Sequence, residues 1–128
     1  MIKPLTPYDK FYISTNGYIQ LAMHCKKESY VEPILSNLKK MAIGTQLRIE
    51  NDNLIMEKLN VPIYRLPDTI STPYEATNYI VENLTTKPSI SLATIAANKN
   101  IVAINSHHLC FDGGIALEIF NSLRDGIE

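Results

Sequence analysis

Residues 101–114 read Ile101-Val-Ala-Ile-Asn-Ser-His-His-Leu-Cys-Phe-Asp-Gly-Gly114. The first part, up to Asn105, is apolar and rich in β-branched residues, which predicts a buried strand. Two adjacent histidines follow, and Asp112-Gly-Gly then breaks the extended chain. From Ile115 onward apolar residues recur at helical spacing. A strand, a tight loop and a helix in this order would hold an imidazole rigidly at the edge of a sheet.

The residues before this stretch predict a partner for its strand. Ile90–Ala97 is almost entirely apolar, and Asn98-Lys-Asn100 between the two runs is a turn signal. We therefore expect an antiparallel hairpin of residues 90–97 and 101–106. Because both strands carry few polar residues, this hairpin should form the centre of the sheet.

The remaining chain predicts further helices and strands around this hairpin. Helical periodicity and capping signals predict helices over residues 28–42, 72–84 and 113–124, with one or two further turns after Thr6-Pro7. Alternating or proline-bounded runs predict strands, at residues 18–25, 45–50, 54–58 and 61–67. The expected fold class is α+β. It is a two-layer sandwich in which a mixed, mainly antiparallel sheet carries the three helices on one face.

Size and composition set the broad class of protein. The chain has 128 residues, which predicts a single domain over residues 1–128, and 45% of them are hydrophobic. The net charge of −1 predicts neither a nucleic-acid partner nor an acidic tail. No apolar run approaches a membrane span, and the N-terminus lacks the apolar core of a signal peptide. With only two cysteines and no disulfide framework, we expect a cytoplasmic protein.

The spacing His107-His108-x-x-x-Asp112-Gly113 resembles the signature of the coenzyme A-dependent acyltransferase superfamily. That superfamily includes chloramphenicol acetyltransferase, the condensation domains of nonribosomal peptide synthetases and alcohol acetyltransferase-like enzymes. All four fixed positions are present, and the predicted strand and helix flank them as they should. The resemblance runs from Pro4 to about Arg124. It corresponds to only the N-terminal half of a condensation-type or alcohol acetyltransferase-type enzyme.

The residues themselves also suit acyl transfer. A thioester acceptor must lose a proton, and neutral imidazole, with a reference pKa of about 6.5, is a suitable base near neutral pH. Adjacent residues on a strand point to opposite faces, so only one of the two histidines can face a given cleft. The resemblance implies that His108 is the catalytic base and that His107 packs behind it. It also implies that Gly113 leaves room for substrate.

The resemblance gives Asp112 a structural role, as the partner of an arginine that fixes the loop. The usual register places Gln46 at the arginine position, so this chain departs from the pattern there. Arg48 lies two residues further on, on the same strand face, and is the preferred partner. Arg65 is the second candidate, and a solvated strand arginine is the alternative for Arg48.

Three functions follow from these observations. The first is an acyltransferase that moves an acyl group to a small alcohol or amine. Its co-substrate would be acyl-coenzyme A or a phosphopantetheine thioester, and it would hold no tightly bound cofactor. The second is a half-domain that acts by binding a partner and is inactive alone. The third uses His107, His108 and Asp112 as metal ligands, or Cys110 as a nucleophile. Opposite-facing histidines disfavour a metal, and a cysteine between bulky apolar neighbours is more often buried.

Assembly is the last expectation from the sequence. An acyl-transfer tunnel needs two walls, and this chain would supply the wall that carries the histidines. A large apolar face left open to water is uncommon on a monomer. We therefore expect a homo-oligomer or a separate second half-domain, with His108 near the contact.

Overall fold

The computed structural model describes residues 2–15, 17–58, 63–84, 86–110 and 113–126. Its α-helices are α1 (Pro7–Thr15), α2 (Val31–Met41), α3 (Pro73–Asn83) and α4 (Gly113–Leu123). Three short 3-10 helices lie at η1 (Glu28–Tyr30), η2 (Ile43–Gln46) and η3 (Arg124–Gly126). Its strands are β1 (Ile2–Pro4), β2 (Tyr18–His24), β3 (Leu47–Glu50), β4 (Asn53–Met56), β5 (Ile63–Arg65), β6 (Ala93–Ala97) and β7 (Ile101–His107). The predicted α+β class is confirmed.

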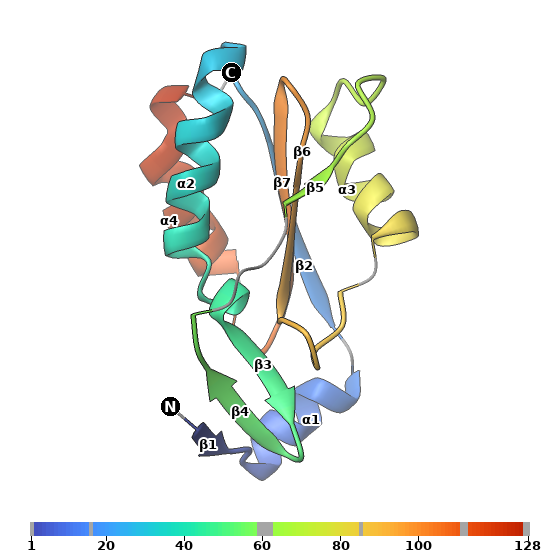
Figure 1. Cartoon of the computed structure of the whole chain (residues 1–128), viewed down its shortest axis with the longest axis vertical. Coiled ribbons are helices and arrows are strands. Elements are labelled where there is room, and N and C mark those ends of the chain that lie inside the picture. Colours follow the sequence, from blue (N-terminus) through green and yellow to red (C-terminus); the bar gives the residue numbers. More distant parts are fainter. Residues whose placement is uncertain (1, 16, 59–62, 85, 111–112, 127–128) are drawn as a thin grey trace.

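The strands form two sheets, as Figure 1 shows. The larger sheet has the order β2-β7-β6-β5, and all its pairings are antiparallel except that of β5 with β6. The predicted hairpin of β6 and β7 thus occupies the two central positions. The smaller sheet has the order β1-β4-β3 and is fully antiparallel. Its β1 strand was not predicted, and the strands predicted at residues 45–50 and 54–58, which were expected to join the single mixed sheet, lie in this separate one.

Turn and cap residues explain where several elements begin and end. Asn51 and Asp52 both have positive φ, at 50° and 60°, which is the backbone of a tight two-residue hairpin turn. Thr72 caps α3: its Oγ1 accepts the Glu75 N–H at 3.2 Å and donates to Glu75 Oε1 at 2.9 Å. A reciprocal pair of the same kind opens α1, where the backbone N–H groups and side chains of Thr6 and Asp9 bond each other. These are the capping boxes that the sequence predicts.

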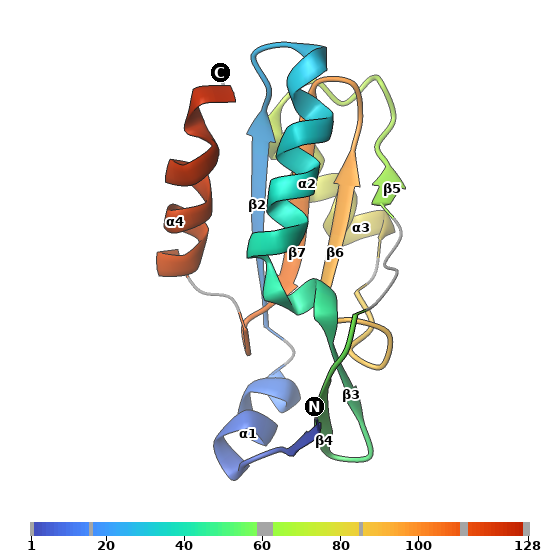
Figure 2. The same ribbon diagram turned by 60° about the vertical axis from the view of Figure 1, so that its left-hand side comes forward.

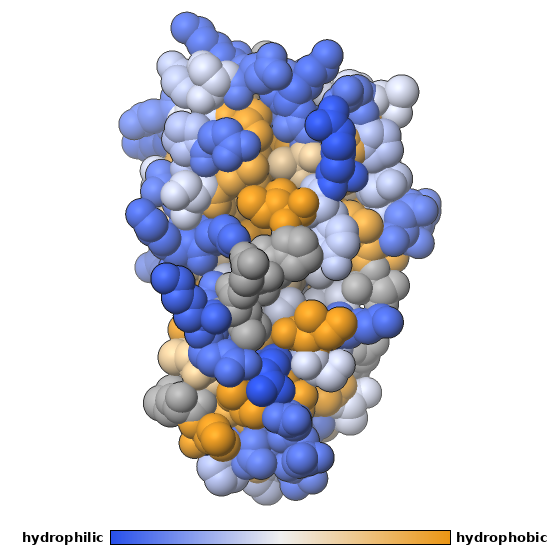
Figure 3. Space-filling model, viewed as in Figure 1, coloured by the Kyte–Doolittle hydropathy of each residue, from blue (hydrophilic) through white to orange (hydrophobic). Residues whose placement is uncertain are grey.

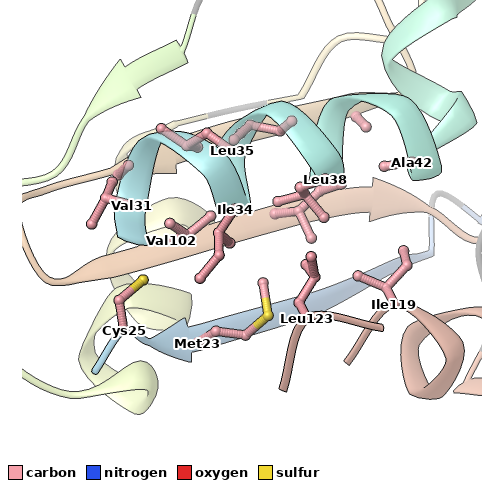
Figure 4. Packing of buried hydrophobic residues seen from close by; sticks show 14 residues of the cluster. Met23, Cys25, Val31, Ile34, Leu35, Leu38, Ala42, Val102, Ile119 and Leu123 are labelled. Carbon is pink, nitrogen blue, oxygen red and sulfur yellow. The ribbon is translucent and has the colours of Figure 1, made fainter. Parts of the chain in front are cut away.

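The main core lies on one face of the larger sheet, beneath α2 and α4. Figure 2 shows these two helices side by side over that face. Figure 4 shows how their apolar side chains meet those of β2 and β7. The most deeply buried members come from the helices and from three strands: Met23, Leu38, Ile95, Val102, Ile104 and Ile119. This packing positions β7, and with it the histidine motif.

The expected position of the residue 72–84 helix is wrong. Helix α3 packs on the opposite face of the larger sheet, where Ala76 and Ile80 contact Ala96, Ile101 and Ala103. The reason is the period of two along a strand. In β6 and β7 apolar residues point to both faces, and each face must be covered to keep them from water. The sheet therefore has helices on both sides.

Candidate active site

Strand β7 carries the motif to one end of the larger sheet. It pairs with β2 in a register that sets His107 opposite Tyr18, and Ser106 and His107 are both fully buried. Residues 108–110 then leave the sheet in a turn, and α4 begins at Gly113. The predicted order of strand, turn and helix is therefore present.

His107 is held inside the protein as a neutral imidazole. Its Nδ1 accepts a hydrogen bond from the Leu109 N–H at 3.0 Å, so Nε2 carries the proton. Nε2 has no hydrogen-bond partner among the described residues. The ring meets that of Tyr18 edge to face, with centroids 5.1 Å apart. Burial, and secondarily the charge of His108, lower the pKa of His107 below its ordinary value.

His108 lies in different surroundings, one residue further along. Its side chain is exposed, while its backbone N–H donates to the Gly17 carbonyl at 2.9 Å. That bond ties the turn to the loop before β2. The structure thus places one histidine of the pair inside the protein and the other at the surface.

Cys110 is the last described residue of the turn. Its N–H donates to the His107 carbonyl at 3.2 Å, and its Sγ lies 3.7 Å from Ser106 Oγ. Burial raises the pKa of the Cys110 thiol. A nucleophilic cysteine needs a lowered pKa, so these surroundings do not favour one here. Gly44 of η2 packs closely against Cys110: a Cβ added to this glycine would lie 2.9 Å from Cys110 Sγ.

The predicted arginine partner of Asp112 cannot be placed, because Asp112 lies outside the described residues. Arg48 Nε bonds Glu57 Oε1 at 2.6 Å, and its Nη1 bonds Glu50 at 3.0 Å. Arg65 bonds both carboxylate oxygens of Asp68 at 3.1 Å. Each candidate arginine thus has a carboxylate partner of its own.

A polar cluster beside His107 was missed in the sequence. The Asn105 side chain accepts from Gln20 Nε2 at 2.7 Å and donates to Thr86 Oγ1 at 3.0 Å. Thr86 Oγ1 also lies 2.7 Å from Thr94 Oγ1, and the Tyr18 hydroxyl donates to the Thr86 carbonyl at 3.2 Å. The sequence feature that could have predicted this cluster is the presence of polar residues at alternate positions of β2 and β7. These satisfied bonds make a rigid polar layer next to the motif.

The described residues contain no group of three or more His, Cys, Asp or Glu side chains placed to hold a metal ion. No helix in the described part of the chain has the length and apolar character needed to cross a membrane. Two large cavities lie elsewhere on the molecule, of about 850 and 500 Å³, and His108 lines neither. Figure 3 shows hydrophobic side chains reaching the surface between α2 and β5, where the smaller cavity lies.

Comparisons with known proteins identify the fold. No family model and no curated protein matches this chain. The starter condensation domain of the rhizomide synthetase does match, in several solved structures. A double mutant of that domain superposes with a TM-score of 0.65 at 13% identity, over 96% of this chain and 36% of the other. The unmutated domain gives a TM-score of 0.56 at 15% identity, over 100% of this chain and 41% of the other.

Chloramphenicol acetyltransferase also matches, over 100% of this chain and 98% of its own. Its identity is 11% and its TM-score 0.46, a superposition too loose to add to the argument. The chain spans between 36% and 41% of the condensation domains named above. The described fold is therefore that of part of a condensation domain, over a segment well under half the length of a solved condensation domain.

Proposed function

We propose that this protein takes part in acyl transfer from a coenzyme A or carrier-bound thioester to a small alcohol or amine, with His108 as the general base. One observation carries the proposal: the two histidines lie at the end of β7, a central strand of a condensation-type fold, with the His108 side chain exposed and the His107 side chain buried.

In this reaction the His108 imidazole removes the proton from the acceptor hydroxyl or amine as that atom attacks the thioester carbonyl. The carbon–sulfur bond then breaks, and the imidazolium returns the proton to the departing thiolate. An ester or amide and a free thiol are the products. Such a base must be held in place, because misplacement by even about 1 Å can cost on the order of 100-fold in rate.

The described contacts supply that positioning. The His108 N–H donates to the Gly17 carbonyl, and the next N–H, of Leu109, donates to His107 Nδ1. The Cys110 N–H then donates to the His107 carbonyl. Three successive backbone groups of the turn are thus fixed by hydrogen bonds. His107 anchors two of them from inside the sheet and acts as a positioning residue.

The proposed site needs a further wall. His108 is exposed, it lines neither large cavity, and the chain is much shorter than the condensation domains it matches. We include in the proposal a second copy of the chain or a second half-domain that covers His108. This observation also favours the second candidate, a half-domain that binds such a partner and catalyses nothing itself.

Thiol release from acetyl-coenzyme A, with a panel of small alcohols and amines, tests the proposal. His108→Ala should lower the rate by about 10² to 10⁴. His24→Gln is the matched control, since His24 lies at the far end of β2 from the motif and its replacement should leave the rate within a few-fold. A His108→Ala variant as active as the wild type would exclude the base. Absence of thiol release even when the partner is present would favour the binding function instead.

A further inference from the structure

The larger cavity, of about 850 Å³, lies where the C-terminal end of α2 meets η2 and the end of β4. Its described lining residues are Lys39, Lys40, Ile43, Gln46, Met56, Glu57 and Lys58. We call it the lysine cavity. Its volume falls within the range of small-molecule sites, which is about 300 to 1,000 Å³.

The charges around the lysine cavity are unbalanced. Lys39 and Lys40 come from the last turn of α2, and Lys58 follows β4, so two separate elements bring three ammonium groups together. None of the three forms a salt bridge within the described residues. The one carboxylate among the described lining residues, Glu57, is bonded to Arg48 at 2.6 Å. The cavity therefore offers a net positive charge to a ligand.

The position of two lysines near the end of a helix has a simpler explanation. Cations in a last turn interact favourably with the helix dipole, and that accounts for Lys39 and Lys40. It does not account for Lys58, which follows β4 and lies on no helix. Nor does it account for the apolar part of the lining.

The apolar lining comes from Ile43 and Met56. Ile43 is 45% exposed, although the next two residues of η2, Gly44 and Thr45, are buried. Met56, at the end of β4, is half-buried. Methionine suits the wall of a ligand site because its flexible thioether adapts to irregular shapes. The lining thus combines apolar side chains, which suit hydrocarbon, with lysines, which suit an anion.

We propose that the lysine cavity binds an amphiphilic anion, namely an unbranched apolar chain that ends in a carboxylate or a phosphate. The chain would pack against Ile43 and Met56, and the anionic group would lie among Lys39, Lys40 and Lys58. This site is separate from His108 and does not rest on the proposed acyl transfer.

Octyl phosphate and octanoate, each below its critical micelle concentration, are suitable probes in titration calorimetry of the full chain. Both should bind, while octanol, which lacks the charge, and inorganic phosphate, which lacks the chain, should bind at least about tenfold more weakly. The affinity for the anions should fall as salt is raised, since the lysines lie at the surface. Whichever of the two anions binds more tightly shows which head group the cavity prefers.

Charge-reversal variants locate the site. The double variant Lys39→Glu/Lys40→Glu should weaken octyl phosphate binding by tenfold or more. Its matched control is Lys26→Glu/Lys27→Glu, because those exposed lysines lie before the opposite end of α2. Ile43→Ser should weaken both anions without changing their salt dependence. The proposal is overturned if octanol binds as well as octyl phosphate, if both double variants lose affinity equally, or if neither anion binds at millimolar concentration.

Discussion

Replacing His107 by asparagine should make the free energy of unfolding less sensitive to acid. The imidazole is fully buried, and its Nδ1 accepts the Leu109 N–H at 3.0 Å. Protonation would place a charge away from water and turn this acceptor into a donor that faces another donor. Asparagine keeps an acceptor, its Oδ1, but has no proton to gain in this range.

The sign and size of the effect follow from the lowered pKa of His107. Above the ordinary histidine pKa of 6.5 the ring is neutral in both the folded and the unfolded chain. Protonation of His107 therefore takes nothing from the free energy of unfolding at these pH values. As the pH falls below 6.5, the unfolded chain binds a proton that the folded chain does not. The free energy of unfolding then falls by up to about 1.4 kcal/mol per pH unit. The loss ends once the pH passes the lowered pKa of the folded state.

Urea unfolding between about pH 5 and pH 8 measures this difference. The wild type should lose stability relative to His107→Asn as the pH falls through the window below 6.5. His108→Asn serves as the control and should change the profile less than His107→Asn does, because burial is the larger cause of the lowered His107 pKa and the charge of His108 the smaller one. A constant loss from the smaller asparagine side chain shifts the whole curve and leaves the slope unaffected. Parallel profiles for the wild type and His107→Asn would refute the reasoning.

Three other predictions concern stability and assembly. Gly44→Ala should destabilise the protein by about 1 to 3 kcal/mol, because the new Cβ would lie 2.9 Å from Cys110 Sγ and 3.1 Å from Ala93 Cβ; an unchanged denaturation midpoint would contradict this. Thr72→Ala should cost about 1 kcal/mol through loss of the α3 cap, whereas Thr77→Ala, within the exposed part of the same helix, should cost less in the same denaturation experiment. Light scattering should show self-association or, with a second half-domain added, a complex; a strictly monomeric chain with robust thiol release would contradict the proposed second wall.

The local elements were predictable because their signals are local. Thr72-Pro73 with Glu75 marks the start of α3, and Asn51-Asp52 marks the β3–β4 turn without reference to the rest of the chain. The face of the sheet that α3 covers depends instead on packing. Ala96 and Ala103 gave too weak a signal for a second apolar face, since alanine occurs in cores, on surfaces and in helices alike.

The motif could be read in the sequence, but its surroundings could not. His107, His108 and Asp112 have a fixed spacing, whereas the polar layer beside them joins Gln20, Thr86 and Asn105 from distant parts of the chain. The lysine cavity is similar, because Lys40 and Lys58 meet only once the β3–β4 hairpin has folded against the end of α2. The three-residue β1 strand has no periodicity of its own to detect and is defined by its pairing with β4.

The tight contact at Gly44 limits how the protein can respond to a ligand. Helix η2 has the lysine cavity on one side and the motif turn on the other, and its glycine touches that turn so closely that not even a methyl group would fit. Close-packed interiors compress very little. A ligand too large for the lysine cavity therefore cannot gain room by pushing η2 toward Cys110 and Ser106. Any widening has to come from the lining residues outside η2, such as Met56 and Lys58, so the η2 side of the cavity limits the ligand size.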